Sequence, residues 1–478
     1  MVPTTLNLPV APLAPPVLSP SLPHSPLIPT LADCSLLTDL YQLTMAACYC
    51  GEGLDQRPAR FEMFVRRLPP DFGYLVAMGL TQALDYLEQF RFTPDQIAAL
   101  QATGIFNRAP DRFWDLLLQE GFTGDVWAVP EGSIVFAHEP LLRIDAPLWQ
   151  AQIVETYLLN VLNYQTLIAT RAARIRDVAG PEAILLEFGS RRAFSPQGAL
   201  WAARAALAGG FDATSNVLAA LQLGRCPSGT MAHALVMALS ALEGTEDQAF
   251  TAFHQYFPGS PLLIDTYDTV AAADRLAQRV QAGESIPGVR LDSGDLLTLS
   301  QAVGDRLPDT QIFASGDLDE LEIQRLRTAG AKIAGYGLGT KLVTGTPVNG
   351  VYKLVDIDGI PVMKEAESKI TYPGCKQVFR TISQGQLQGD RLGLATEAPQ
   401  GGEVPLLQQV MHQGQRLYFP ESLDTLAQRT TQQVALLPDS LRRIEQPFNY
   451  PVRLSLALAN LTQATRRTLS MAPIPPFP

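Results

Sequence analysis

The sequence predicts an α/β protein, because its central part repeats a short apolar run, a polar turn and a helical segment in that order. The turns are rich in Gly, Ser, Thr and Asp, and they follow one another at roughly 20–35 residues, about the length of a βα unit. Such units close into a barrel or form an open doubly wound sheet, and both place the turns at the carboxyl ends of the strands, where active sites form. The apolar runs are Ile184–Phe188, Gly210–Asp212, Gln222–Cys226, Leu262–Asp265, Gly288–Asp292, Gln311–Ser315 and Lys332–Tyr336.

The segments on either side of this central part have mixed patterns. Ahead of it, the patterns predict a helix over 40–48 behind the capping pair Thr38-Asp39, a strand over 60–68, and helices over 80–90 and 94–100. Behind it, they predict a strand over 351–355 and turns at 358–359 and 373–374. We expect this later segment to pack with the N-terminal region.

These patterns divide the chain into two domains and two tails. Residues 126–354 form the α/β domain with the site, and residues 31–125 together with 355–462 form an α+β domain. Residues 1–30 contain nine prolines and no Asp, Glu, Lys or Arg, so we expect a disordered tail there. Residues 463–478 are expected to be a shorter Pro-rich tail.

The composition excludes several classes of protein. The 478 residues are 46% hydrophobic and 17% charged, which predicts a large core, and the net charge of -11 argues against a nucleic-acid binder. Five cysteines without a C-x-x-C pair favour a reduced, cytoplasmic compartment and no metal cluster. The absence of Lys and Arg before Arg57 argues against a secretory signal or transit peptide. Polar residues interrupt the apolar stretch 153–169, so no membrane span is expected.

The turn Ser228–His233 is the most informative motif. Small residues ahead of a helix expose backbone N–H groups that bind anions, and a histidine in the first turn can act as a base or accept a phosphoryl group. Asp265 ends a neighbouring strand and could fix the tautomer of that imidazole. Two alternatives stay open: His233 is an ordinary histidine at a helix start, and Asp265 is the N-cap of the next helix.

Further polar residues fall in the later turns. Alternation in the strand directs Arg290 and Asp292 toward the barrel centre, where Arg290 binds an anion or forms a salt bridge with Asp292. Asp317 offers a carboxylate suited to ribose hydroxyls, and the turn Gly337-Leu-Gly-Thr340 offers N–H groups suited to phosphate, although tight-turn geometry alone could explain its glycines. Phe188 and Tyr41 could stack on an aromatic ring or pack in the core.

Together the turns suit a phosphorylated ribose and a small aromatic acid. At this point the sequence, over about residues 36–458, resembles the nicotinate phosphoribosyltransferase family. Seven segments in the same order carry the resemblance: Leu37–Met45, Glu187–Ala193, Gly210–Val217, Gly229–His233, Asp265–Asp268, Val289–Asp295 and Gly337–Thr340.

The resemblance implies an irregular α/β barrel of the type II phosphoribosyltransferase kind, with a second α+β domain built from both chain ends. It implies a homodimer with shared active sites that makes nicotinate mononucleotide and diphosphate from nicotinate and phosphoribosyl pyrophosphate, in NAD biosynthesis. ATP is the co-substrate, and Mg²⁺ accompanies the diphosphate substrate and ATP.

The resemblance also implies roles for the pyridine pocket. Tyr41 would reach into the partner's site and stack on the pyridine ring, with Phe188 on the other face. Arg290 would hold the nicotinate carboxylate, and Thr230 and Ser215 would line the pocket. 

Other residues would serve the phosphorylated substrates. Arg191 would contact the substrate near Phe188. Asp317 would bind ribose, and Thr340 with Gly337 and Gly339 would hold the phosphate. His233 would accept the phosphoryl group of ATP while Asp265 orients its ring.

Two other functions remain as alternatives. The related nicotinamide phosphoribosyltransferase carries an acidic residue where this chain has Ser215, and a carboxylate there would repel nicotinate, so Ser215 favours the acid. A barrel that binds nucleotides without catalysis would have no physical need for the pair His233 and Asp265.

Overall fold

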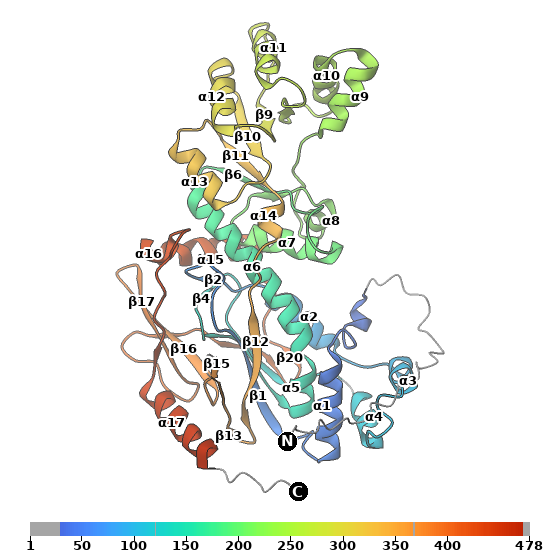
Figure 1. The fold of residues 1–478 in the computed structure, drawn as a ribbon, viewed down its shortest axis with the longest axis vertical. Helices are drawn as coiled ribbons and strands as arrows, with labels where there is room; N and C mark the ends of the chain where they lie inside the picture. The colour runs from blue at the N-terminus through green and yellow to red at the C-terminus, as the bar shows by residue number, and fades with distance from the viewer. Residues whose placement is uncertain (1–28, 120, 367–368, 472–478) are drawn as a thin grey trace, which may run out of the picture.

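The computed structural model describes residues 29–119, 121–366 and 369–471, which fold into two domains. Helix α6 (Glu155–Ala179) joins them: it packs against α2 (Leu80–Gln89) in one domain and against α7 (Pro196–Ala208) and α13 (Glu320–Thr328) in the other. Figure 1 shows the α/β domain in the upper part and the antiparallel sheets in the lower part, with α6 running between them. The expected tail 1–30 falls almost entirely outside the described residues.

The α/β domain is built on one parallel sheet of six strands, in the order β7-β6-β11-β10-β9-β8. Strands β7 and β8 are its two edges, so the described strands form an open, irregular barrel, as expected. The strands are β6 (Ile184–Glu187), β7 (Ala213–Thr214), β8 (Leu262–Leu263), β9 (Gly288–Leu291), β10 (Gln311–Ser315) and β11 (Gly335–Leu338). The remaining helices are α8 (Val217–Gln222), α9 (His233–Glu243), α10 (Glu246–Tyr256), α11 (Thr269–Gln281), α12 (Leu296–Arg306) and α14 (Thr340–Val343).

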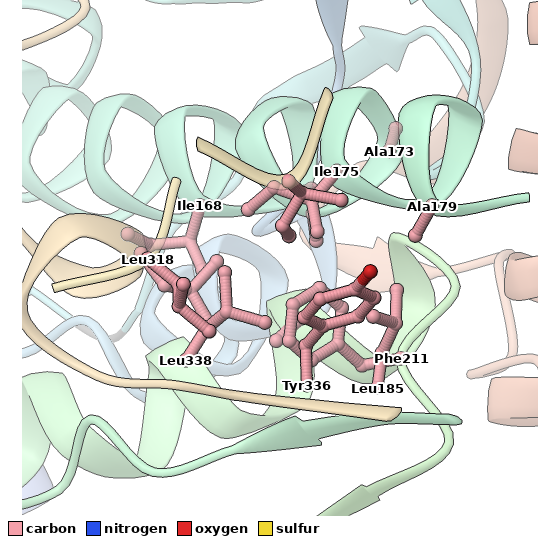
Figure 2. Close-up of a cluster of buried hydrophobic side chains, with 14 of the residues drawn as sticks. Ile168, Ala173, Ile175, Ala179, Leu185, Phe211, Leu318, Tyr336 and Leu338 are labelled. Atoms are coloured by element: carbon pink, nitrogen blue, oxygen red, sulfur yellow. The ribbon is translucent and has the colours of Figure 1, made fainter. Parts of the chain in front are cut away.

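Helix α6 covers this sheet with an apolar face. In Figure 2, Ile168 and Ile175 of α6 face Leu185 of β6 and Tyr336 and Leu338 of β11, and all five side chains are buried. Removing one such aliphatic side chain from water contributes about 1.5–3 kcal/mol, so this contact fixes the barrel against the rest of the molecule.

The second domain combines distant parts of the chain. Its main sheet has the order β13-β12-β1-β5-β3-β19-β20, and the central strand β1 (Pro58–Val65) pairs antiparallel with both β5 (Pro140–Pro147) and β12 (Gly350–Ile357). The prediction that the segment after the barrel returns to the N-terminal region is therefore confirmed. The other strands are β3 (Asp125–Ala128), β13 (Ile360–Pro361), β19 (Gln408–His412) and β20 (Gln415–Arg416).

A second, four-stranded sheet completes this domain, in the order β18-β16-β17-β21. Its strands are β16 (Lys376–Ser383), β17 (Gln386–Leu394), β18 (Val404–Pro405) and β21 (Arg453–Leu454). Two further sheets have two short strands each: β2 (Leu75–Val76) pairs with β4 (Ile134–Val135), and β14 (Lys364–Ala366) pairs with β15 (Lys369–Thr371). The helices of the domain are α1 (Leu40–Gly51), α3 (Pro94–Ala102), α4 (Asp111–Leu117), α5 (Leu148–Ile153), α15 (Leu423–Ala435), α16 (Asp439–Arg442) and α17 (Leu456–Met471).

Several sequence-based expectations need correction. The barrel does not begin at residue 126, because β3 and β5 pair in the antiparallel sheet, and it ends before residue 354, because β12 pairs with β1. Residues 463–471 are not a tail, since α17 continues through them. The run 222–226 is not a strand but the end of α8 and a loop, and the strand predicted over 210–212 lies at 213–214.

The buried charges of the second domain are paired. The Lys376 ammonium forms a salt bridge with Glu62 at 2.8 Å, and Arg380 donates to Asp390 at 2.6 Å. Burial and the neighbouring Asp390 raise the pKa of Glu139, which lies beside this second pair, well above its usual range. At the junction with α7, Arg204 donates to Glu131 at 2.7 Å, and although burial opposes it, the guanidinium holds the pKa of Glu131 below its usual value. No described helix is both long and apolar enough to span a bilayer.

Candidate active site

The carboxyl ends of the parallel strands bring the predicted turns to one edge of the sheet. Register pairs Arg290 with Phe313, Ser315 with Gly337, and Glu187 with both Leu338 and Thr214. The residues that follow these positions therefore lie side by side, although they are far apart in the sequence. The expectation that the turns gather at one edge holds.

Arg290 lies in this edge without a charged partner. Its Nη1 donates to the Thr230 hydroxyl, and its buried Nε has no hydrogen-bond partner. Among the described residues, no carboxylate oxygen lies within 4.0 Å of its nitrogens, so the salt bridge with Asp292 does not form. Burial lowers the pKa of Arg290, which is the cost of holding an uncompensated cation away from water. A ligand anion would remove that cost.

Ser215 and Phe188 follow β7 and β6 at the same edge of the sheet. The Ser215 hydroxyl donates to the Glu187 carbonyl at 3.2 Å, and the loop at Gly229 passes close to it, since a Cβ on Gly229 would lie 3.9 Å from that of Ser215. The half-buried Phe188 ring packs over Gly337, where a Cβ would lie only 2.5 Å from the ring. Any side chain at position 337 would displace the aromatic ring.

The two glycines of the predicted phosphate turn therefore lie in different structural elements. Gly337 is inside strand β11, not in a turn, and leaves room for Phe188. Gly339 is the residue ahead of the short helix α14, and Thr340 is its exposed first residue. Only the second half of the motif can present backbone N–H groups to a phosphate.

His233 begins α9 and lies near Asp265 without a hydrogen bond to it. Its Nε2 lies 4.0 Å from Asp265 Oδ1, and its Nδ1 lies 3.0 Å from the Thr266 hydroxyl. Asp265 Oδ2 accepts from the Asp292 N–H at 2.8 Å, whereas buried Oδ1 has no partner. The free oxygen could bond the imidazole after a shift of roughly 1 Å. Asp265 is not a helix cap, because Asp268 caps α11 by accepting from the Ala271 N–H.

Asp292 and Asp317 lie on the next two turns. The Ser315 hydroxyl donates to Asp292, and a Cβ on Gly316 would lie 2.2 Å from the Asp292 carbonyl oxygen, so position 316 requires glycine. Asp317 is exposed and has a φ of 45°, a left-handed conformation that aspartate tolerates better than most residues. The close approach of the two turns places both carboxylates at the same edge.

Tyr41 and Arg191 are less closely tied to this group. Arg191 is exposed in the turn after Phe188, and its charge is felt at Arg290. Tyr41 lies on α1 in the other domain, with 48% of its surface exposed. Within one chain, Tyr41 does not join the residues at the barrel edge.

The prediction that the pair Thr38-Asp39 caps α1 with a side chain is wrong. The Asp39 carboxylate accepts a hydrogen bond from the Thr156 hydroxyl and makes no hydrogen bond to the first turn of α1.

Three polar residues of this region were not predicted as site residues: Glu187, Thr214 and Thr266. Glu187 is a fully buried carboxylate at the end of β6, and the Thr214 hydroxyl donates to it at 2.5 Å. An acidic residue that ends an otherwise apolar strand was the signal that could have found it. Thr266 had no comparable signal, because its contact with His233 depends on the loop before α11.

The described residues contain no group of three or more His, Cys, Asp or Glu side chains placed to hold a metal ion. All five cysteines are free thiols.

Most of the chain is similar to known proteins. Family models of the nicotinate phosphoribosyltransferase N-terminal domain, the nicotinate phosphoribosyltransferase family and its C-terminal domain match residues 36–163, 184–378 and 403–462. Nicotinate phosphoribosyltransferase pncB2 of Mycobacterium tuberculosis is 40% identical over 434 residues, which cover 88% of this chain and 91% of the relative. The Bacillus subtilis and human nicotinate phosphoribosyltransferases are 39% and 34% identical, cover 88% and 90% of this chain, and are themselves covered to 93% and 96%.

Solved structures agree with these matches. The crystal structure of human nicotinic acid phosphoribosyltransferase superposes with a TM-score of 0.77 and 31% identity, covering 90% of this chain and 99% of the human one. A nicotinate-nucleotide pyrophosphorylase from Pyrococcus furiosus, at 24% identity, shares the fold with a TM-score of 0.71 over 85% of this chain and 97% of its own. The chain belongs to the nicotinate phosphoribosyltransferase family.

Proposed function

We propose that the barrel edge around Arg290 is the site at which this chain joins nicotinate to phosphoribosyl pyrophosphate, giving nicotinate mononucleotide and diphosphate. The observation that carries the proposal is the half-buried Arg290, whose Nε is buried without a hydrogen-bond partner, whose Nη1 donates to Thr230 and which has no ion-pair partner among the described residues. A substrate carboxylate would supply the missing charge and accept from the guanidinium.

In this proposal the pocket acts mainly by positioning. Phe188 stacks on the pyridine ring while Arg290 and Ser215 hold its carboxylate. The ring nitrogen then attacks ribose C1, the C1–oxygen bond to diphosphate breaks, and the positive charge of the pyridinium remains on the product. Because the developing charge is spread between ribose and the leaving diphosphate, orientation and nearby cations such as Arg191 lower the barrier. Asp317 and Asp292 are suited to the ribose hydroxyls, and Gly339 with Thr340 to the 5′-phosphate.

His233 provides a separate step with ATP. An imidazole nitrogen attacks the γ-phosphorus, ADP leaves, and the phosphoryl group stays on His233 until water releases it as phosphate. Support for this role comes from the partly exposed ring, the Thr266 contact on Nδ1, and the unpartnered Asp265 oxygen 4.0 Å from Nε2. Mg²⁺ has no site of its own among the described side chains, so it would arrive on the diphosphate and ATP oxygens.

A labelling experiment tests the histidine. With ATP and Mg²⁺, His233 should gain one acid-labile, base-stable phosphate per chain, and His233→Ala should abolish both the label and the stimulation by ATP. Some ATP-independent synthesis should survive, because stacking and carboxylate binding do not need the imidazole. A label that persists in His233→Ala would show that another residue accepts the phosphoryl group.

The same proposal assigns Tyr41 to the partner subunit of a homodimer. Its exposure on α1, away from the barrel edge of its own chain, supports this assignment. Mixing Tyr41→Ala chains with Arg290→Ala chains should restore activity, because a hybrid dimer has one site with both residues. Absence of rescue, with subunit exchange shown by mass spectrometry, would place Tyr41 in the site of its own chain.

The competing substrate is nicotinamide. Ser215 is uncharged and lies at the edge of the pocket, which favours the acid over the amide. A product assay with nicotinate, nicotinamide and quinolinate, each with and without ATP, decides between them. Comparable rates with nicotinate and nicotinamide would overturn the substrate assignment. We place the reaction in the cytoplasm, in keeping with five free thiols.

A further inference from the structure

Glu187 lies beside the candidate site. Its carboxylate is buried and has no cation next to it among the described residues. It is 0% exposed, and no Lys, Arg or His nitrogen of the described chain lies within 4.0 Å of it. Burial raises the pKa of Glu187, while hydrogen bonds from Thr214 and Gly189 favour its charged form. A group this costly to bury is retained only where its hydrogen bonds matter.

The two carboxylate oxygens of Glu187 bind two different turns. Oε1 accepts from the Gly189 N–H, in the turn after β6, and Oε2 accepts from the Thr214 hydroxyl, at the end of β7. The Thr214 hydroxyl in turn accepts from the Asn216 N–H at 3.0 Å, so the direction of its proton is fixed toward Glu187. The side chain is thus a bridge between the segments that carry Phe188 and Ser215.

The backbone of Glu187 makes the same connection. Its carbonyl oxygen accepts from the Ser215 N–H at 3.0 Å and from the Ser215 hydroxyl at 3.2 Å. Gly189 has no room for a side chain, since a Cβ would lie 2.8 Å from the Glu187 carboxylate and 2.2 Å from Val343. Every polar atom of Glu187 that faces β7 is therefore engaged in setting the distance between the two turns.

We propose that Glu187 is a positioning residue for nicotinate: its carboxylate holds the Phe188 turn and the Ser215 turn at the separation of a pyridine ring. The proposal rests on the assignment of Phe188 and Ser215 to the pyridine pocket. It predicts that weakening the bridge acts on nicotinate and leaves phosphoribosyl pyrophosphate nearly unaffected, because Asp317 and Thr340 belong to other turns.

The test compares the KM of each substrate in three variants. Glu187→Leu removes both hydrogen bonds and should raise the KM for nicotinate at least tenfold, with less than a threefold change for phosphoribosyl pyrophosphate. Glu187→Gln keeps the shape, accepts from the Gly189 N–H and donates to the Thr214 hydroxyl, so it should restore most of the nicotinate affinity. Thr214→Val removes one end of the bridge and should fall between them; it also keeps the test open if Glu187→Leu does not fold.

Glu139→Gln is the matched control, since Glu139 is an equally buried carboxylate in the other domain; both KM values should stay unchanged. An equal rise in both KM values in the Glu187 variants, or a lower melting temperature alone, would make Glu187 a general structural residue. Glu187→Gln as impaired as Glu187→Leu would also overturn the bridge. Phe188→Ala separates the two proposals: if it leaves the KM for nicotinate unchanged, the pocket assignment itself fails.

Discussion

The two domains of the molecule treat buried charge in opposite ways. In the antiparallel domain Lys376 bonds Glu62, and Arg380 bonds Asp390, so these guanidinium and ammonium groups have carboxylates at 2.6–2.8 Å. At the barrel edge, Arg290 and the Asp265 carboxylate each keep a buried polar atom without a partner. Buried polar atoms without a hydrogen-bond partner occur in both domains, so the difference lies in the counter-charge: Lys376 and Arg380 each have a carboxylate beside them, and Arg290 has none among the described residues.

The largest loss of stability should come from breaking a buried salt bridge of the antiparallel domain. Lys376 is 2% exposed, forms a salt bridge with Glu62 and donates to Tyr372 O and Gly374 O, so Lys376→Met leaves the fully buried Glu62 without its counter-charge. We expect a loss of about 3–5 kcal/mol in the free energy of unfolding, measured by urea denaturation. The folded fraction should keep the wild-type KM for nicotinate.

A double variant controls this experiment. Lys376→Met with Glu62→Gln removes both charges and should recover part of the lost stability. A loss below about 1 kcal/mol in Lys376→Met would contradict the view that pairing stabilises this domain.

Removing the unpaired cation Arg290 should have the reverse effect: a large loss of catalytic efficiency and little change in stability. Arg290→Ala should lower kcat/KM for nicotinate by about 2–4 kcal/mol, roughly 30- to 1,000-fold, because the substrate carboxylate loses its partner. Stability should change little or rise, since an uncompensated buried charge disappears. Steady-state kinetics and thermal unfolding measure the two effects. Arg192→Ala, an exposed arginine nearby, is the control and should be nearly silent.

A smaller change sharpens the comparison without touching any charge. Gly337→Ala places a methyl group 2.5 Å from the Phe188 ring, so the ring must move. Overpacking of this kind costs about 1–3 kcal/mol, and we expect it chiefly as a higher KM for nicotinate. Gly51→Ala, where a methyl group meets nothing within 4 Å, is the matched control. Equal kinetics in the two variants would remove Phe188 from the pocket.

The smallest effect is on the pH dependence of stability, because the pKa values of two buried carboxylates, Glu139 and Glu131, are shifted in opposite directions. The pKa of Glu139 is raised in the folded chain by burial and Asp390, so its contribution favours folding below the ordinary value of about 4.5 and is lost as pH rises. The pKa of Glu131 is lowered by Arg204 against the effect of burial, so its contribution is present above that value and is lost as pH falls. Relative to the wild type, Glu139→Gln should therefore gain stability as pH rises above about 4.5, whereas the stability deficit of Glu131→Gln should be constant there and should shrink as pH falls below about 4.5. Parallel pH profiles of the two variants would contradict these directions.

The local sequence pattern predicted well where the strands of the barrel lie, but it predicted poorly which strands pair with one another in the other domain. The run 311–315 is β10 without a shift, and the turns met at one edge because parallel strands end together. The boundary at residue 126 failed because β3 and β5 are recognisable as strands, but nothing local reveals that their neighbours are β1 and β19. The helix α17 over 456–471 was missed because the prolines that follow Met471 suggested a tail.

In the candidate site, too, some features could be predicted from the local sequence and others depend on contacts between distant segments. Arg290, Asp292 and Phe188 could be predicted because strand alternation and position at a strand end are properties of the local sequence. The room that Gly337 leaves for Phe188, and the contact of Thr266 with His233, depend on segments that meet only after folding. Sequence therefore predicted which residues face the site more readily than it predicted what holds them.

The pairing of β1 with both β5 and β12 fixes an order of events on the ribosome. Strand β5 emerges soon after β1, but β12 follows only when the whole barrel has been translated. At 5–20 residues per second, one edge of β1 stays unpaired for about 15–60 s of elongation. An open strand edge invites pairing with other chains, so the nascent antiparallel domain is the part of this protein most in need of a chaperone.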